Sequence, residues 1–530
     1  MLRFFAKLTM PNRITEKIFR LSPFFILCVL FLSSFAAQAQ DGIEIIHADL
    51  FGFVRAGEKF QQLNNDVIVK QDNMLLYCDS ALKNDTRNVM DAYGHVRLVQ
   101  GDSFTVIGDF LHYDANTRIA NISHNVVLTQ PDFTLTTQEL IYDTKSKVGY
   151  YPVFGKIVNR ENTLTSSTGY YYSNEKYSYF KKNVDLKNHD YHITCDTLKY
   201  NNNTSVAYFP GFTTIVKIAD STVITCNNGW YDKVKGNSQF SKKVKIKQPG
   251  QTLYCDSMNW NNEQEHGDAY RDIILLDSVN KLQVTGNYSH YNRKKQLTKV
   301  ANKAIATQLV DNDSMHLHGD TLFYYSDSAE GKRLQAYHHV KIYKSNMQAV
   351  ADSMWYRYKD SLMVFYNHPI VWVDSTQLTA DTISIKFKNK KADMVILRRN
   401  SFIISVEDSL RYNQIKGRDI NAYFKNNDLQ LVKVFQEGEC IYYIKDDVKA
   451  YIGVNKITCV NMDIYLDSGQ VKGVNYKGVP DGIMYPLKEL TPEELLLKKF
   501  FWYGSLRPKS KKSLIEDKNQ QPDIEQEIKQ

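Results

Sequence analysis

A short phrase that recurs about every thirty residues constrains the fold of this chain more than any other feature. In each copy an aliphatic residue, a small residue and an acidic residue precede alternating apolar residues, as in Val106-x-Gly108-Asp109-x-Leu111-x-Tyr113. One repeat of this kind cannot bury its apolar face alone, so such repeats stack into an array. Fourteen copies align, and the fourth residue after the acidic position falls at 53, 83, 113, 142, 172, 200, 231, 260, 291, 324, 356, 385, 422 and 464.

The phrase predicts a bend at its acidic residue. Side chains alternate along a strand, and the apolar residues after the acidic position have the opposite parity to those before it. A continuous strand could not bury both sets, so a bulge or corner is expected there. A short carboxylate can accept hydrogen bonds from backbone N–H groups freed at such a bend. The structural corner residues predicted in this way are Asp79, Asp109, Asp196, Asp256, Asp320, Asp352 and Asp381.

A ladder of catalytic or calcium-binding carboxylates is the competing interpretation of these acidic residues. Calcium-binding repeats cluster several oxygen ligands in each short repeat, whereas this chain has one Asp for about thirty residues. His316 and His318 share a strand face, but no clear third ligand accompanies them, so no metal site is predicted. No nucleophile elbow, phosphate-binding loop or dinucleotide fingerprint indicates an enzyme or a cofactor.

Most cysteines occupy the small position of the phrase. Glycine and alanine fill that position in other copies, so these cysteines are expected to be small buried residues. Cys195, Cys226 and Cys255 lie in successive copies, so the sequence leaves open whether two of them form a disulfide. The cysteines at the small position are Cys78, Cys195, Cys226, Cys255 and Cys459.

A second alternating run lies between the phrases, as in Asn183-Val184-x-Leu186 and His339-Val340-x-Ile342. Each repeat therefore supplies about two strands with a bend and two turns. Stacking predicts an all-β fold, in which about fourteen repeats form two facing sheets around an apolar interior. The inward fourth position is aromatic in most copies, at Phe53, Tyr113, Tyr142, Tyr172, Tyr200, Tyr231, Trp260, Tyr291, Tyr324 and Tyr356.

The ends of the chain differ from the array over residues 40–485. Basic residues, an apolar run from Leu21 to Phe35 and a small-x-small site predict a cleavable signal peptide over 1–39, with an inner-membrane anchor as the alternative. A helical cap is expected over 486–504, because Thr491 to Glu494 resembles a capping box. Residues 505–530 are expected to form a disordered polar tail. The net charge of +8 is modest for 530 residues and does not indicate nucleic acid.

The repeated phrase resembles the OstA-like, LptA-type family of lipopolysaccharide-transport proteins. His112-Tyr113-Asp114 and Ile141-Tyr142-Asp143 are similar to strands of that family, and the resemblance covers about residues 41–470. It implies an elongated, twisted β-jellyroll in the periplasm, here two or three jellyroll lengths long. It also implies an apolar groove that shields lipid A acyl chains, and no catalytic residues or cofactors. Inner- and outer-membrane transport components would pair with its edge strands, and self-association is a further expectation.

Two other functions stay open beside lipopolysaccharide transport. A structural or adhesive β-solenoid would have a fully packed interior. A polysaccharide-active solenoid enzyme would gather acidic and basic side chains on one face of adjacent repeats, whereas the regular Asp coincides with the corner. The residues expected to line the lipid groove are Leu111, Tyr113, Val126, Leu128, Val184, Leu186, Leu198, Tyr200, Leu322, Tyr324, Val340 and Ile342.

Overall fold

The computed structural model describes residues 42–516 except 57, 102–103, 311–312, 327–330, 390, 426–427, 447, 449, 468–469 and 488. The expected signal peptide and the end of the expected tail, 517–530, lie outside the described residues. The chain divides into two compact units, residues up to 120 and residues from 121 onward. Among the described residues, no helix combines the length and the apolar character needed to cross a membrane.

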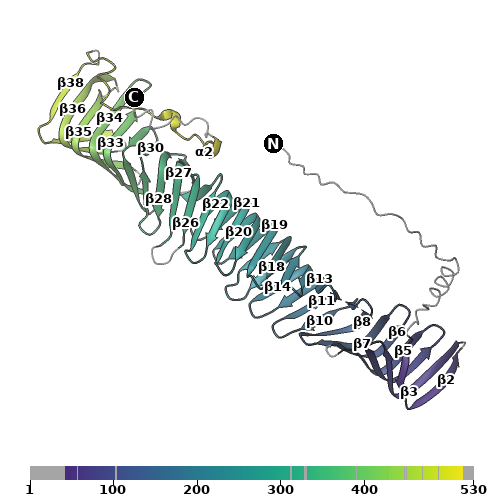
Figure 1. Ribbon diagram of the computed structural model, residues 1–530. Helices are drawn as coiled ribbons and strands as arrows, with labels where there is room; N and C mark the ends of the chain where they lie inside the picture. The colour runs from purple at the N-terminus through teal and green to yellow at the C-terminus, as the bar shows by residue number, and fades with distance from the viewer. Residues whose placement is uncertain are drawn as a thin grey trace, which may run out of the picture. The chain divides into compact units, whose positions relative to one another are not determined.

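Antiparallel strands make up nearly all of both units, which confirms the all-β prediction (Figure 1). Strand β7 (Ile119–Gln130) leads from the first unit into the second. The strands of the first unit are β1 (Glu44–His47), β2 (Leu50–Ala56), β3 (Glu58–Gln71), β4 (Met74–Asn84), β5 (Val89–Gln100) and β6 (Phe104–Asp114).

The second unit continues this pattern with shorter and longer strands. Its first half contains β8 (Phe133–Asp143), β9 (Val148–Tyr151), β10 (Gly155–Val158), β11 (Thr163–Ser166), β12 (Thr168–Tyr172), β13 (Tyr177–Lys187), β14 (Tyr191–Asn201), β15 (Val206–Phe209), β16 (Thr213–Lys217), β17 (Val223–Cys226), β18 (Asn228–Asp232), β19 (Asn237–Gln248), β20 (Gln251–Asn261), β21 (His266–Asp277), β22 (Leu282–Asn292), β23 (Leu297–Ala301) and β24 (Ile305–Val310). Its second half contains β25 (Asp313–His318), β26 (Thr321–Tyr325), β27 (Arg333–Lys344), β28 (Met347–Arg357), β29 (Leu362–Tyr366), β30 (Ile370–Val373), β31 (Thr376–Thr379), β32 (Thr382–Lys388), β33 (Lys391–Val406), β34 (Tyr412–Lys425), β35 (Asp428–Lys445), β36 (Tyr451–Asp467), β37 (Gln470–Lys477) and β38 (Asp481–Tyr485), followed by the 3-10 turn η1 (Gly504–Leu506) and the helix α2 (Ser513–Glu516).

Each long strand passes through a corner that divides it between two walls. In β14, for example, residues 191–195 pair with β16 and residues 199–201 pair with β15. We name the part before the acidic position wall 1 and the part after it wall 2, together with their paired neighbours. Turns such as 218–221 close the free end of wall 1, and turns such as 202–205 close the free end of wall 2.

The corner is a β-bulge, as the change of parity predicts. Lys181 pairs with Thr197 and Val184 with Cys195, so the two residues between them on β13 face the single residue Asp196 on β14. Lys182 and Asn183 have φ values of 61° and 53°, in the left-handed region. Similar left-handed pairs recur at 242–243, 271–272, 302–303, 338–339, 367–368, 399–400 and 436–437. The bend is therefore formed by the residues beside each acidic position, because the extra residue of a bulge must turn out of the ladder.

The apolar interior of the second unit is most completely packed in its C-terminal part. A continuous cluster of buried residues runs from Leu282 to Ile464 and combines wall 1 residues such as Ile342 with wall 2 residues such as Met363. A separate and smaller cluster, which includes Ile215, Phe240 and Met258, lies in the preceding repeats. The interior is therefore not uniformly closed along the unit.

The segment after β38 folds back over the outer surface of the strands that precede it. Three buried glutamines bond to it. Gln414 Nε2 donates to Leu495 O and Gln377 Nε2 donates to Phe501 O, both in its main chain, and Gln348 Oε1 accepts from the side-chain Nε of Arg507. Farther along, α2 contacts β25 and β27 (Figure 1). We name residues 486–516 the C-terminal strap.

The strap differs from the expected helical cap and polar tail. Thr491 and Glu494 form the reciprocal bonds of a capping box, with a Thr491 N–H to Glu494 Oε2 distance of 2.9 Å. The chain then makes turns over 492–495 instead of a regular helix. Residues 505–516, expected in the disordered tail, pack against the sheet and bury Leu514. Contacts with the sheet override the local preference for helix, because tertiary packing outweighs propensity in a short segment.

Candidate functional site

Wall 1 of the second unit presents a continuous row of aliphatic side chains toward the interior. The pairing places one residue from each successive strand in register, and branched aliphatic residues recur because they suit a pleated surface. Many of these side chains are only half-buried, and they pack beside the smaller core cluster. The row consists of Leu186, Ile193, Ile215, Ile224, Ile246, Leu253, Leu275 and Val284.

Wall 2 presents a row in which aromatic and smaller residues alternate. Trp260, for example, pairs with Gly267, where an added Cβ would lie only 2.6 Å from the indole ring. Small neighbours therefore make room for each ring. Trp260 and the aliphatic row of wall 1 contact the same core cluster, so the two rows face each other. In order the wall 2 row is Tyr142, Gly149, Tyr171, Ser178, Tyr200, Ala207, Tyr231, Ser238, Trp260, Gly267, Tyr291, Thr298 and Tyr324.

The exposure of this aromatic row changes along the unit. Tyr142 and Tyr324, near its two ends, are each 4% exposed. Between them Tyr171, Tyr200 and the aromatic residues up to 291 are half-buried. We name the half-buried residues of both rows between 171 and 291 the interior stripe. Half-buried aromatic and aliphatic side chains on facing walls form an apolar surface that water partly reaches.

A polar clasp joins the walls at the C-terminal end of the interior stripe. Tyr324 on wall 2 donates its hydroxyl to Asp277 Oδ2 on wall 1 at 2.8 Å, and Asn280 Nδ2 donates to the same oxygen at 2.8 Å. Lys332 Nζ lies 3.4 Å from that oxygen. Burial alone would raise the pKa of Asp277, but the hydrogen bonds from Asn280 and Tyr324 outweigh it and lower the pKa. Burial and the bond to Asp277 both raise the pKa of Tyr324.

A small apolar pocket lies directly beyond the clasp. Side chains of both walls line it, including Leu282, Ala306 and Met315 from wall 1 and Leu334, Tyr356 and Met363 from wall 2. From this point onward the interior is filled by the large core cluster. The clasp therefore marks the boundary between the half-buried and the fully packed interior.

Nearly all the residues expected to line a groove point into the interior, but few of them are accessible. Leu111 and Tyr113 are buried in the first unit, where the Tyr113 hydroxyl donates to Gln71 Oε1. In the second unit only Leu186 and Tyr200 of the expected set are half-buried. The others are buried, namely Val126, Leu128, Val184, Leu198, Leu322, Tyr324, Val340 and Ile342.

The corner carboxylates bond mainly to side chains of the neighbouring bulge. Asp79 contacts His95 Nδ1 at 2.8 Å, and Asp320 contacts His339 Nδ1 at 2.7 Å. That these carboxylates also accept from backbone N–H groups stays a prediction. The backbone N–H of the acidic residue donates to a left-handed residue, as Asp320 does to His338 O at 3.0 Å. The remaining side-chain contacts are Asp196 with Thr197, Asp256 with Arg271, Asp352 with His338 and Asn367, and Asp381 with Asn400, while Asp109 lies beside the next bulge.

The cysteines and the two paired histidines have structural surroundings. Cys78, Cys195, Cys226, Cys255, Cys440 and Cys459 are free and buried. Burial is the main cause that raises the pKa of Cys195 to about 12, so its thiol stays protonated near neutral pH. His318 Nδ1 contacts Ala304 O at 2.8 Å, and His316 Nδ1 contacts Thr307 Oγ1 at 2.9 Å. In the described part of the chain, no group of three or more potential metal-binding side chains occurs.

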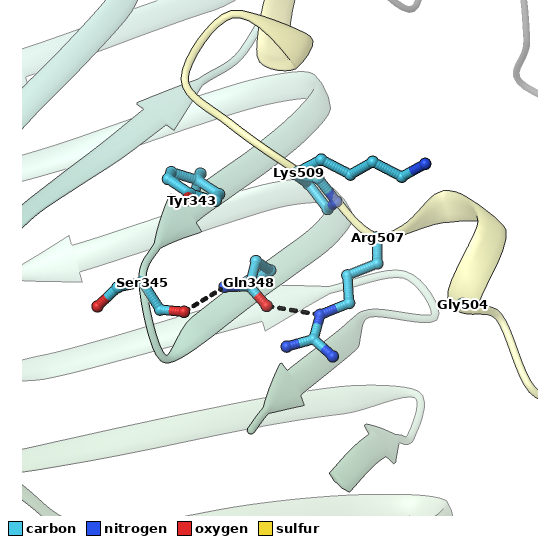
Figure 2. A pocket seen from close by; sticks show the side chains of 7 residues that line it. Tyr343, Ser345, Gln348, Gly504, Arg507 and Lys509 are labelled. Atoms are coloured by element: carbon cyan, nitrogen blue, oxygen red, sulfur yellow. Dashed lines mark hydrogen bonds between the residues drawn. The ribbon is translucent and has the colours of Figure 1, made fainter. Parts of the chain in front are cut away.

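A polar pocket lies under the C-terminal strap. Figure 2 shows Arg507 pointing from the strap toward Gln348 on β28, with a distance of 2.6 Å between Arg507 Nε and Gln348 Oε1. The Gln348 amide also donates to Ser345 O at 3.2 Å. Tyr343 and Lys509 complete the rim. These contacts anchor the strap and lie on the outer side of wall 1, away from the interior stripe.

Several features of the site were not predicted from the sequence. The glutamines that hold the strap look like ordinary polar residues of strands, and nothing local marks them as buried. The aromatic row includes Tyr171 in place of the predicted Tyr172, because Tyr171 pairs with Gly149 and Ser178. The left-handed pairs did carry a signal, since Lys182-Asn183 and His338-His339 directly precede the valine that opens the second run.

Comparisons with known proteins find matches to parts of the chain. A search of curated proteins finds no match to the chain. A search of solved structures finds the crystal structure of LptH from Pseudomonas aeruginosa, described as the LptA-homologous periplasmic component of the conserved lipopolysaccharide transport device. That match has 14% sequence identity and a TM-score of 0.19, and it covers 21% of this chain and 79% of LptH. Residues 40–196 match the family described as OstA-like protein, which is the family that the repeated phrase resembles.

Proposed function

We propose that the protein is a periplasmic lipopolysaccharide carrier that shields acyl chains between the two walls of its second unit. The observation that carries this proposal is the interior stripe, in which facing aromatic and aliphatic residues such as Tyr200 and Ile193 are only half-buried. A folded protein normally packs such residues against one another, and an apolar surface left accessible marks a binding site. The OstA-like match over residues 40–196 supports the same class of protein.

The repetition of the stripe suits movement of a ligand along the unit. Each methylene of an acyl chain gains about 0.8 kcal/mol when it leaves water. Successive long strands offer nearly equivalent contacts, because each contributes one aliphatic residue to wall 1 and one aromatic or small residue to wall 2. An acyl chain that moves along the unit by the width of one strand therefore meets a similar apolar surface. No step in this function requires a catalytic group or a cofactor.

The ends of the strand array are the proposed docking surfaces for membrane components and for further copies of the protein. Strand β38 pairs with β36 on one side and exposes Ile483 and Met484. Exposed edge strands accept an additional strand from a partner, because their backbone groups are available for pairing. Export by the expected signal peptide over 1–39 would deliver the protein to the periplasm.

A photo-crosslinking experiment with lipopolysaccharide tests the carrier function. A benzoyl-phenylalanine probe is placed at Leu186, Tyr200 or Tyr231 in the interior stripe, each in a separate variant of the full chain. Lys199 provides the matched control, because it neighbours Tyr200 in β14 and points to the opposite face. Adducts at the stripe positions and none at Lys199 are expected.

A second control position separates carriage from a purely structural role. Ile342 is 0% exposed within the large core cluster, where the packed interior favours the scaffold alternative for that part of the unit. No adduct is expected there unless the walls separate. If none of the three stripe positions forms an adduct with lipopolysaccharide, the carrier function fails and a structural β-solenoid is the better interpretation.

A further inference from the structure

The turns that close each wall stack on one another. We name the row of turns that closes wall 1 the wall 1 rail, and the row that closes wall 2 the wall 2 rail. On wall 1, Ile218 N–H donates to Asp190 O at 2.9 Å, and Ser278 N–H donates to Gly250 O at 3.0 Å. On wall 2, Lys233 N–H donates to Ser205 O at 3.2 Å, and Arg293 N–H donates to Glu265 O at 2.9 Å. These bonds fix each turn to a turn of an adjacent hairpin. The rails therefore hold charged side chains at regular places along the side opposite the corner.

Ion pairs bridge the two rails of the second unit with one polarity. Lys233 on the wall 2 rail pairs with Glu161 on the wall 1 rail, 72 residues earlier in the sequence. Arg293 Nη2 lies 3.7 Å from Asp220 Oδ2, again with the cation on wall 2. Lys332 and Asp277 repeat this arrangement within the clasp.

The first unit contains a pair of the same kind. Arg118, in the turn after β6, pairs with Asp72, in the turn between β3 and β4. In both units the cation lies on wall 2 and the carboxylate on wall 1. Pairs formed at random on a surface would show either orientation, so this arrangement is a regular feature of the fold.

The bridging pairs differ in how firmly they are held. The Lys233 and Glu161 side chains are 55% and 65% exposed, whereas the Asp277 side chain is 3% exposed. Asp277 also accepts bonds from Tyr324 and Asn280, which fix it in place. Exposed ion pairs contribute little to stability, so another anion can replace the carboxylate. The Lys233 and Arg293 pairs are therefore the exchangeable ones.

These exchangeable cations lie on the rail of the wall that carries the aromatic stripe. Lys233 follows β18, which contributes Tyr231, and Arg293 follows β22, which contributes Tyr291. Both cations are thus only two residues from a half-buried ring. An amphiphile whose tails lie on these rings would bring its head group to the rail. A phosphate group there would meet Lys233 or Arg293 first.

We propose that Lys233 and Arg293 bind the phosphate groups of an acylated, phosphorylated amphiphile, and that Glu161 and Asp220 occupy these cations when no lipid is bound. This inference rests on the proposed carrier function and adds a head-group site to it. Phosphate is favoured over a neutral head group because charge-assisted hydrogen bonds from lysine and arginine to phosphate are short and strong. Binding exchanges one anionic partner for another and involves no covalent step.

The test compares the binding of two lipids to the full-length protein. The probes are lipid A with its phosphates and the same lipid A with both phosphates removed, each in competition with a fluorescent fatty acid below micelle concentration. The Lys233→Gln/Arg293→Gln variant is expected to raise the Kd of phosphorylated lipid A about tenfold or more and to leave the Kd of the dephosphorylated lipid unchanged. Phosphatidic acid serves as a third probe that distinguishes general phosphate recognition from recognition of a phosphorylated sugar.

Two further variants keep the outcome interpretable. Glu161→Gln/Asp220→Asn frees both cations and is expected to lower the Kd of phosphorylated lipid A. Lys235→Gln/Lys294→Gln removes two exposed cations of the same rail that have no ion-pair partner among the described residues, and it is expected to bind as the wild type does. Equal weakening of both lipids by Lys233→Gln/Arg293→Gln, or no change, would overturn the head-group site. If the wild type binds neither form of lipid A, the carrier function itself fails.

Discussion

Tyr324 and Asp277, 47 residues apart in the sequence, join the two walls of the second unit through a hydrogen bond of 2.8 Å. The bond lies where the half-buried interior stripe ends and the packed core cluster begins. It is one of few direct polar links between the walls in the described part of that unit. The link therefore marks where the packed part of the interior begins.

Removing the hydroxyl in Tyr324→Phe is expected to lower the free energy of unfolding by about 1–2 kcal/mol, because Asp277 loses a donor in a buried place. Urea unfolding, followed by tyrosine and tryptophan fluorescence, measures the change. Tyr356→Phe is the matched control, because Tyr356 belongs to the same wall and its hydroxyl has no hydrogen-bond partner among the described residues. An equal loss in both variants would contradict a specific role for the clasp.

The clasp also predicts a dependence of stability on pH. Because its bonds with Asn280 and Tyr324 lower the folded-state pKa of Asp277, the ionised carboxylate stabilises the fold above the unfolded pKa of about 4. That contribution is lost as the pH falls through the lower folded-state pKa. The difference in urea midpoint between the wild type and Asp277→Asn is therefore expected to shrink below about pH 4. Replacing exposed Asp132 by Asn is the control, and a pH-independent difference for Asp277→Asn would refute the prediction.

The alternation of rings and small residues on wall 2 predicts a steric limit at Gly267. A Cβ there would lie 2.6 Å from Trp260 Cε3 and 2.7 Å from Asn259 O. Gly267→Ala is expected to destabilise the protein by about 1–3 kcal/mol, because the packed backbone cannot move away. Gly211→Ala is the control, since its Cβ would meet no atom closer than 3.9 Å. Thermal unfolding of the two variants makes the comparison.

The buried glutamines predict how the C-terminal strap is held. Gln377 is 0% exposed, donates to Phe501 O at 2.8 Å and accepts from Tyr503 N–H at 2.8 Å. Gln377→Ala removes both of these hydrogen bonds to the strap, at a cost of about 1–3 kcal/mol. Trypsin is then expected to cut the strap faster at Lys498 or Lys499, since proteolysis follows the population of the opened segment.

A matched control for the strap exists on the same wall. Gln283 lies in register with the row that contains Gln348, because pairing runs from Gln283 through Thr307, His316 and Tyr343. The strap does not bond to it in the described residues. Gln283→Ala should leave the rate of tryptic cleavage unchanged. Faster cleavage in both variants would indicate general destabilisation instead of release of the strap.

The repeated architecture could be predicted from the sequence because it depends on local pattern. Alternating residues fix which side chains share a face, and the change of parity at Asp196 or Asp256 predicts the bulge that the pairing shows. The interior character of Tyr200 and Leu186 follows from the same alternation. These features require only the two-residue period of a strand and the need to bury apolar side chains.

The degree of burial and the contacts across the walls could not be predicted in this way. Pairing of Arg293 with Asp220 depends on the offset between two rails, which the twist of the whole unit sets. The same limit applies to the strap. Leu495 follows a correctly predicted capping box, yet its carbonyl accepts from Gln414 in a distant strand instead of continuing a helix. Contacts between residues far apart in the sequence decide both outcomes.

The position of the strap in the chain imposes an order on folding. The strands that it covers, which include β25, β27, β28 and β34, precede residues 486–516 in the chain and are therefore synthesised first. Their outer surface, which includes the fully buried Trp372, consequently stays exposed to water until the strap has been synthesised. A chain that lacks the strap would expose this apolar surface to chaperones and to other chains, so docking of the strap is expected to be a late step of folding.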